Sequence, residues 1–199
     1  MKTLASILVL VLVLGVDAYA QEDYFFGFEY NTVLPSGETD DFGGGWSWRG
    51  GSFGGRKVVR DNTTVGFWVG WHVMNDEGDE YVGFRGENNN LDVTGYQFRY
   101  VNSFPLMVNG HWYTGMTGDI RPFVGLNVGT YYIERRVEFG MLVVDDDSWH
   151  FGLAPEAGIV FPLGWRARGL LTARWNWAAS AGGSGDITYW NFGIGVAWM

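Results

Sequence analysis

The chain has 199 residues, a formal net charge of -9 and no Cys, so it can form no disulfide, thiolate metal site, cysteine nucleophile or cysteine lipid anchor. The acidic balance argues against nucleic acid as a partner, because displacing counterions from phosphate backbones requires clustered Lys and Arg. The remaining composition, with 31 Gly, 11 Trp and 18% aromatic residues, favours strands and turns over helices.

The first twenty residues have the pattern of a secretory signal peptide. Lys2 supplies a positive start, residues 4–16 carry no charge, and an Ala-Tyr-Ala sequence ends at Ala20, where small residues suit signal peptidase. This apolar stretch is shorter than the roughly 20 residues that a helix needs to cross a bilayer. We therefore expect residues 1–20 to be a cleaved signal peptide and residues 21–199 to form the mature domain.

From residue 23 onward, apolar residues alternate with polar or small ones, which is the period of strands that face two environments. The strands predicted from this alternation are residues 24–34, 46–59, 63–74, 96–113, 122–135, 149–161, 170–179 and 189–198. In the second of them the alternation loses its phase around Gly pairs at 50–51 and 54–55. We expect a bulge or kink there.

Short and long connections alternate between these strands. The short ones are residues 60–61, 115–119 and 162–164, and the long ones are residues 35–45, 75–92, 136–148 and 180–187. Tight turns at one end and longer loops at the other are typical of the hairpin order of an outer-membrane barrel. An even number of strands also lets the first and last pair antiparallel, which leaves no open edge in lipid. The pattern predicts an all-β, eight-stranded, antiparallel up-and-down transmembrane barrel.

The bulky apolar face of each strand is expected to point outward, toward lipid. An interior enclosed by eight strands is only wide enough for side chains to fill, so the opposite face, rich in Gly, Asn and Thr, suits the inside. Aromatic residues recur near the strand ends, where membrane barrels carry interfacial girdles. They are Tyr24, Trp112, Tyr113, Trp165 and Trp198 at the turn side, and Trp71, Trp149 and Trp177 at the loop side. The alternative is a soluble barrel with an aromatic core.

Two segments carry a resemblance to a known family. Residues 121–129 read RPFVGLNVG and residues 191–198 read NFGIGVAW, and with the strand pattern they resemble the small outer-membrane β-barrel family of OmpA-, OmpX- and OmpW-type proteins. The resemblance implies a C-terminal assembly signal that the barrel-insertion machinery reads, and it implies residence in the outer membrane of a Gram-negative bacterium. The signal residues would be Trp190, Phe192, Ile194, Val196 and Trp198. The family usually ends on an aromatic residue, whereas Met199 follows here.

Charged residues fall on the inward face of the predicted strands. Glu29, Glu156 and Arg174 reach similar heights when residues are counted from the turns, so we expect them to pair, because an unpaired buried charge is costly. The wider interior polar network is expected to be structural and to comprise Glu29, Glu156, Arg174, Arg121, Asn127 and Asn191. The alternative is a proton or ion path through the lumen.

Near the outer mouth, Arg99 and Arg135 are expected to lie beneath strongly acidic loops. The acidic runs at residues 76–80 and 145–147 lack the spacing of a dedicated calcium loop, so we expect no specific metal site and no cofactor. Diffuse bridging by divalent cations would instead connect these loops to lipopolysaccharide. The expected partners are thus outer-membrane lipid and lipopolysaccharide.

The leading functional hypothesis is a monomeric, non-enzymatic barrel with a structural or surface-interaction role. The alternative is a narrow channel or transporter for small apolar solutes, as in the OmpW-type branch. A third hypothesis is a lipid-modifying enzyme, for which only His72, His111 and His150 could serve as the base. No serine forms a recognisable motif with any of them in the sequence.

Overall fold

The computed structural model describes residues 24–40, 44–85, 92–114, 120–139, 142–164, 166–181 and 185–198, with only the backbone for residues 38, 76–85, 92–98, 139 and 142–144. Eight strands and one short 3-10 turn follow one another in these ranges. They are β1 (Tyr24–Ser36), η1 (Gly37–Thr39), β2 (Gly50–Arg60), β3 (Thr63–Arg85), β4 (Asp92–Tyr113), β5 (Arg121–Phe139), β6 (Leu142–Pro162), β7 (Ala167–Ala178) and β8 (Ile187–Trp198). No helix among the described residues has the length and apolar character needed to cross a membrane.

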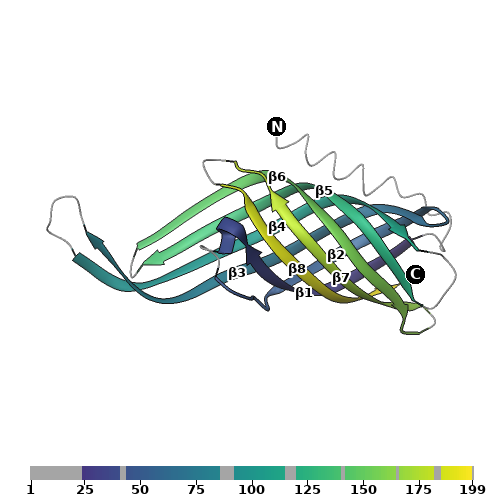
Figure 1. The fold of residues 1–199 in the computed structure, drawn as a ribbon, viewed down its shortest axis with the longest axis horizontal. Coiled ribbons are helices and arrows are strands. Elements are labelled where there is room, and N and C mark those ends of the chain that lie inside the picture. Colours follow the sequence, from purple (N-terminus) through teal and green to yellow (C-terminus); the bar gives the residue numbers. More distant parts are fainter. Residues whose placement is uncertain are drawn as a thin grey trace.

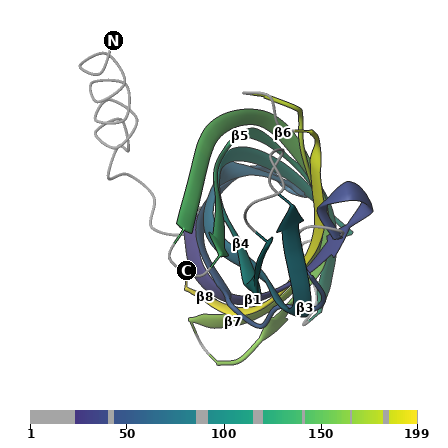
Figure 2. The same ribbon diagram turned by 90° about the vertical axis from the view of Figure 1, so that its left-hand side faces the viewer.

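The strands form one closed antiparallel barrel. Each strand pairs with the next in the sequence, and β1 also pairs with β8 in a continuous register from Phe26–Trp198 to Ser36–Thr188. Figure 2 looks along the barrel and shows the strands closing into a ring. The sheet therefore has no open edge along the wall of the barrel, and the predicted eight-stranded up-and-down barrel is confirmed.

The barrel wall extends unevenly at one of its two ends. The connections β2–β3, β4–β5 and β6–β7 lie at one end, which we name the turn end (Figure 1). The connections β1–β2, β3–β4, β5–β6 and β7–β8 lie at the opposite end, which we name the hairpin end. Strands β3 to β6 have 23, 22, 19 and 21 residues, whereas β1, β2, β7 and β8 have 13, 11, 12 and 12. The four longer strands therefore project past their neighbours at the hairpin end (Figure 1).

This projection corrects two predicted loops. Residues 75–92 and 136–148 were expected to be long loops, but β3 pairs with β4 out to Arg85–Asp92, and β5 pairs with β6 out to Phe139–Leu142. The ladder continues from the barrel wall because each hydrogen-bonded pair positions the next. The sequence did not reveal these strands because a strand is recognised by alternation of apolar and polar residues, and residues 75–85 and 145–148 carry polar or charged residues at both odd and even positions.

Strand β2 is more regular than predicted. Its pairing with β3 runs without interruption from Gly50–His72 to Val58–Thr64, and the only shift in this ladder falls between Val58 and Arg60. The bulge expected at the glycine pairs is therefore wrong. Gly55 instead makes room for aromatic rings, since a Cβ there would lie 2.7 Å from the Phe26 ring and 2.8 Å from the Phe67 ring. The strand begins at Gly50 rather than at residue 46, and only a bridge between Val33 and Ser47 precedes it.

Large apolar side chains cover the outside of the barrel wall. Val108, Ile194 and Phe28 are 64%, 58% and 60% exposed, although each belongs to a regular strand. Further exposed members of this band are Phe26, Val65, Phe67, Leu106, Val124, Leu126, Phe151, Ile159, Leu171 and Phe192. An apolar surface of this kind is far larger than water-soluble monomers normally expose, and it matches the expectation that the bulky apolar face of each strand points outward.

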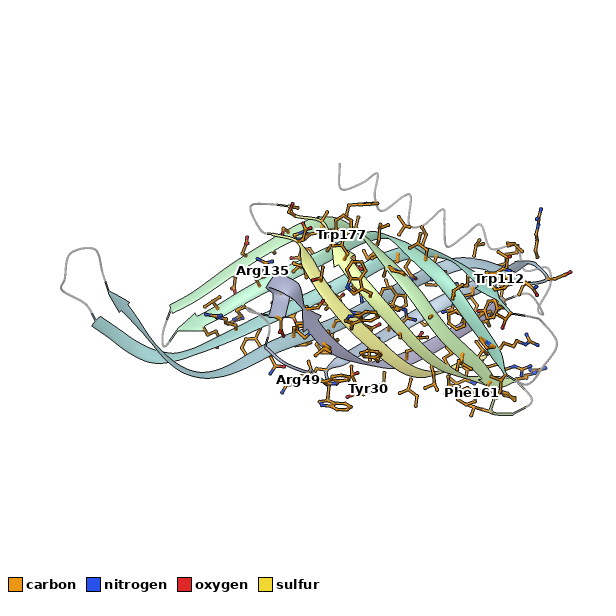
Figure 3. The ribbon with its side chains drawn as sticks, viewed as in Figure 1. Tyr30, Arg49, Trp112, Arg135, Phe161 and Trp177 are labelled. Carbon is orange, nitrogen blue, oxygen red and sulfur yellow. The ribbon has the colours of Figure 1, made fainter. Side chains whose placement is uncertain are left out.

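Most of the predicted aromatic girdle residues point outward. Trp112 and Trp198 are half exposed at the turn end, and Trp71 and Trp149 are half exposed toward the hairpin end. Figure 3 shows Trp112 and Phe161 at the turn end and Trp177 toward the hairpin end. Tyr113 was wrongly assigned to the girdle.

Tyr113 lies inside the barrel instead. It is 4% exposed, because it shares the inward parity of β4, and its hydroxyl accepts a hydrogen bond from Arg56. Tyr24 is half-buried at the start of β1, and Trp165 lies outside the described residues.

The interior of the barrel is layered. A buried apolar cluster fills the turn end and comprises Tyr113, Phe123, Val160, Leu170 and Ala197. A second buried cluster lies toward the hairpin end and includes Val33, Met74, Val101, Tyr131, Ile133, Ile187 and Tyr189. Buried charged and polar side chains occupy the space between the two, which fits the small lumen of eight strands.

The connection between β7 and β8 provides a pH-dependent contact at the hairpin end. Hydrogen bonds from Trp177 Nε1 to Asp186 Oδ2 (3.0 Å) and from the Ser180 backbone N–H to Asp186 Oδ1 (2.8 Å) lower the pKa of Asp186 below its usual value. A lowered folded-state pKa means that this contact stabilises the connection at neutral pH. The stabilisation is lost as the pH falls through the folded-state pKa.

We therefore expect the Trp177 indole N–H resonance to move toward its solvent-exposed position only under acidic conditions, below the ordinary titration range of an Asp side chain. Two-dimensional NMR of the detergent-refolded protein during an acid titration measures this shift. Asp186→Asn is the control, since it keeps an acceptor oxygen but cannot titrate. A Trp177 resonance that titrates identically in both proteins would contradict the assignment.

Candidate functional site

Three charged side chains from three strands meet in the middle of the lumen. Arg174 on β7 donates from Nη1 and Nη2 to the two carboxylate oxygens of Glu29 on β1, at 2.9 and 2.8 Å. Its Nη2 also reaches Glu156 Oε1 on β6 at 3.2 Å, and its Nε lies 3.1 Å from Glu156 Oε2 in an ion pair without hydrogen-bond geometry. One guanidinium thus bridges two carboxylates, which suits its planar fork of donors.

A second guanidinium balances the second carboxylate. Arg56 on β2 donates from Nη2 to Glu156 Oε1 at 2.8 Å and from Nη1 to the Tyr113 hydroxyl at 3.0 Å. His111 Nε2 lies 3.2 Å from Glu156 Oε2, to which Asn127 also donates at 3.0 Å. Glu156 is completely buried, so this saturation of its oxygens offsets the cost of removing the carboxylate from water.

Neutral groups complete the cluster around Glu29 and Arg174. Thr172 donates to Glu29 Oε2 at 2.7 Å, and Asn191 Oδ1 accepts from Arg174 Nη1 at 3.2 Å. The Arg174 guanidinium lies 4.6 Å from the centre of the Trp68 ring, a cation–π contact. Gly193 leaves the space for this arrangement, because a Cβ there would lie 2.4 Å from Glu29 Oε2.

A polar group without net charge lies above the charged cluster, toward the hairpin end. His72 Nδ1 and Ser103 Oγ both lie 3.0 Å from the Tyr189 hydroxyl, and His72 Nε2 lies 3.4 Å from the Asn191 amide. His72 is completely buried. It lies opposite Gly50, in the first residue pair of the β2–β3 ladder, and so at the hairpin end of β2.

The structure brings five of the six predicted network residues together. Glu29, Glu156 and Arg174 are in direct contact, Asn127 binds Glu156, and Asn191 binds Arg174. The remaining predicted residue, Arg121, begins β5 at the turn end and lines a separate small cavity there.

Sequence reasoning missed Arg56 and His111 as members of the cluster. Arg56 has the inward parity of β2, but the bulge expected at the preceding glycines concealed that parity. His111 lies two residues before the end of β4, close to the turn end, and its imidazole reaches Glu156. A regular alternation imposed through residues 50–58 would have placed Arg56 inside.

Arg99 and Arg135 lie toward the hairpin end, but within the projecting strands β4 and β5 rather than beneath loops. Arg99 pairs in the β3–β4 ladder with Asp76, and Arg135 pairs in the β5–β6 ladder with Asp146. Arg135 lines a polar cavity of about 290 Å³ with residues 145–147. Arg136 alongside forms exposed ion pairs with Glu138 at 2.7 Å and Asp145 at 3.7 Å. Basic and acidic residues therefore lie opposite one another in the β5–β6 part of the projecting sheet.

Metal binding and histidine-based catalysis are the two remaining functions that the sequence raised. The described side chains contain no group of three or more His, Asp or Glu arranged to hold a metal ion. Ser148 Oγ lies 2.7 Å from His150 Nε2, and His150 Nδ1 lies 2.8 Å from the Ala179 carbonyl. This serine–histidine contact was not predicted. It joins neighbouring residues on the inward face of β6 and anchors the end of β7.

Comparison with known proteins gives a fold but no sequence family. No family model matches the sequence, and no curated protein matches it. Among solved structures, Neisserial surface protein A superposes with a TM-score of 0.54 at 10% identity, covering 88% of this chain and 96% of that one. Ail, the attachment invasion locus protein of Yersinia pestis, superposes with a TM-score of 0.50 at 10% identity, covering 89% of this chain and 100% of that one.

The chain has the fold of a small eight-stranded outer-membrane β-barrel. The resemblance predicted from the two motif segments is thereby confirmed at the level of the fold. Within this outer-membrane barrel fold, the charged cluster lies in the lumen and the apolar band lies on the outer wall.

Removal of one carboxylate tests the charged cluster of this barrel. Glu156→Ala leaves Arg56 without a carboxylate partner, while Arg174 keeps Glu29, so the free energy of unfolding should fall by about 3–5 kcal/mol. Urea unfolding in lipid vesicles, with the temperature at which the barrel loses its fast migration on a denaturing gel, measures the change.

Glu138→Ala is the matched control, because it removes a glutamate from an ion pair whose Arg136 side chain is 50% exposed. It should change stability by less than about 1 kcal/mol. Equal effects of the two substitutions would show that the buried cluster contributes no more than a surface pair.

Proposed function

We propose that this chain is an integral outer-membrane protein of a Gram-negative bacterium with a structural or surface-interaction role and no enzymatic activity. In this proposal residues 1–20 are a signal peptide that is removed on export. The barrel-insertion machinery then reads the last strand, whose outward residues are Trp190, Phe192, Ile194, Val196 and Trp198. The barrel functions as a monomer in contact with outer-membrane lipid and lipopolysaccharide.

The outward apolar band supports the placement in a membrane. Closed strands satisfy their backbone groups within the barrel wall, which is the condition for crossing a hydrocarbon layer with strands. Trp112 and Trp198 at one end and Trp71 and Trp149 at the other have the half-exposed, interfacial positions of aromatic girdles. The turn end then faces the periplasm and the hairpin end faces outside.

The filled lumen supports a role outside transport. Above the charged cluster, Tyr131, Ile133 and Ile187 are at most 1% exposed, and below it Phe123 is 2% exposed. A solute or ion crossing the barrel would have to displace both apolar clusters and break an ion-paired network. The geometry thus favours the structural role of the cluster over the proton or ion path.

The single observation that carries the proposal is the projecting sheet of β3 to β6 above this closed lumen. Strand β2 pairs with β3 only up to His72, and β7 pairs with β6 only from Gly152. Residues 73–85 of β3 and 142–151 of β6 therefore extend past the ladders of their neighbours, and the exposed residues 145–147 of β6 add acidic side chains to this projecting sheet. Arg136, Asp145 and neighbouring charges suit binding to lipopolysaccharide phosphates bridged by divalent cations.

Two measurements on the refolded protein separate this proposal from the solute-channel alternative. In planar bilayers we expect no stepwise conductance, because the buried side chains of the two apolar clusters occupy the lumen above and below the charged cluster. In a second measurement, a refolded variant in which a two-residue turn replaces residues 136–145 should fold normally and lose binding to purified lipopolysaccharide in the presence of Mg²⁺, because Arg136 and Asp145 are removed together.

A barrel with the η1-bearing connection shortened instead is the matched control and should bind like the parent. A reproducible unit conductance would favour the channel for small apolar solutes. Unchanged lipopolysaccharide binding after removal of residues 136–145 would contradict the surface-interaction role, and covalent labelling of Ser148 by a fluorophosphonate would contradict the absence of enzymatic activity.

A further inference from the structure

A small cavity at the turn end contains two arginines that the central cluster does not use. It has a volume of about 40 Å³, which is room for a few water-sized groups. Arg121 at the start of β5 and Arg168 near the start of β7 both line it. They come from the strands on either side of β6, where Arg121 pairs with Val160 and Arg168 pairs with Pro162.

The described residues that line this cavity include two arginines and no acidic residue. Besides the arginines, the lining consists of Phe25, Val58, Thr64, Tyr113 and Val160, none of which carries a negative charge. The Tyr113 hydroxyl already accepts a hydrogen bond from Arg56. The central cluster differs, because there each guanidinium contacts a carboxylate.

Arg121 also has a buried donor that is not used. Its Nε has almost no contact with solvent and has no hydrogen-bond partner within the described part of the chain. A buried donor on a charged group is costly to leave unsatisfied. An anion in the cavity would satisfy this donor and neutralise the two guanidinium groups together.

We propose that this cavity binds a phosphate group, carried either by free phosphate or by a lipid headgroup. A phosphate offers several acceptor oxygens in the geometry that arginine forks match, and its negative charge balances the arginines better than a neutral ligand. The apolar part of the lining, from Phe25, Val58 and Val160, places a low-dielectric wall beside the two guanidinium groups, which strengthens their attraction to an anion. The identity of the lipid source rests on the proposed function, which turns this end toward the periplasmic leaflet.

The test follows the Arg121 Nε–H resonance in ¹H–¹⁵N spectra of the whole protein in octyl glucoside, a detergent without phosphate. The resonance is assigned by its loss in Arg121→Lys. Inorganic phosphate and, separately, dihexanoyl phosphatidylglycerol are titrated at constant ionic strength. We expect a saturable shift, and in Arg168→Gln we expect the apparent affinity to fall by about tenfold or more.

Arg60→Gln is the matched control, since Arg60 is an exposed arginine at the same end that does not line the cavity. It should bind like the parent, and Arg168→Lys provides a second variant if Arg168→Gln does not refold. Saturation with the lipid alone assigns the site to a headgroup, and saturation with inorganic phosphate assigns it to free phosphate.

Non-saturable shifts with both probes, or equal affinities of the parent and the Arg168 variants, would overturn the proposal. Because the measurement is made in detergent, its failure leaves the membrane placement and surface role untouched. Conversely, phosphate binding would survive if the surface role failed.

Discussion

Closure of β1 onto β8 is the constraint on which the rest of the structure depends. The continuous register from Phe26–Trp198 to Ser36–Thr188 uses the backbone groups that would otherwise form two open edges. Once the sheet is closed with eight strands, its lumen is too narrow for anything but side chains. Each inward residue must then find its partners inside the barrel, and each outward residue within the band must tolerate an apolar solvent.

The charged cluster follows from that division. Two arginines and two glutamates occupy the lumen, and they are arranged so that each charge contacts an opposite one. Replacement of these groups by apolar residues would often be tolerated energetically, so the cluster is weak evidence for stability by itself. Its geometry has a clearer consequence for register, because Glu29, Glu156 and Arg174 meet only when β1, β6 and β7 are paired as observed.

The sequence predicted the parts of this fold that a single periodicity encodes. Outward Trp190, Phe192 and Ile194 alternate with inward Asn191 and Gly193, and this pattern was sufficient to assign the strand, its two faces and the height of its inward residues. The same reasoning placed Glu29, Glu156 and Arg174 at one level. This reasoning failed where both faces of a strand carry polar residues, and where glycines leave no side chain to show the alternation.

The projecting parts of β3 and β6 carry polar and charged residues at both odd and even positions, so no alternation marks them. In β2 the glycines at 54 and 55 have no side chains to show which positions face inward, so the inward position of Arg56 was not predicted. The burial of Tyr113 shows a third limit, since two adjacent aromatics at a strand end cannot both face the interface. Only the register shows that Trp112 points out and Tyr113 points in.

The most direct measurement of the central claim, that the apolar face of the barrel wall meets lipid, is the accessibility of spin labels in a bilayer. The chain has no Cys, so single cysteines at Val108, Val124 and Ile194 can each be labelled without background. The account predicts that collisions with oxygen exceed collisions with a water-soluble nickel chelate at all three positions. Labels that meet the chelate more often than oxygen would show that this face is in water and would contradict the account.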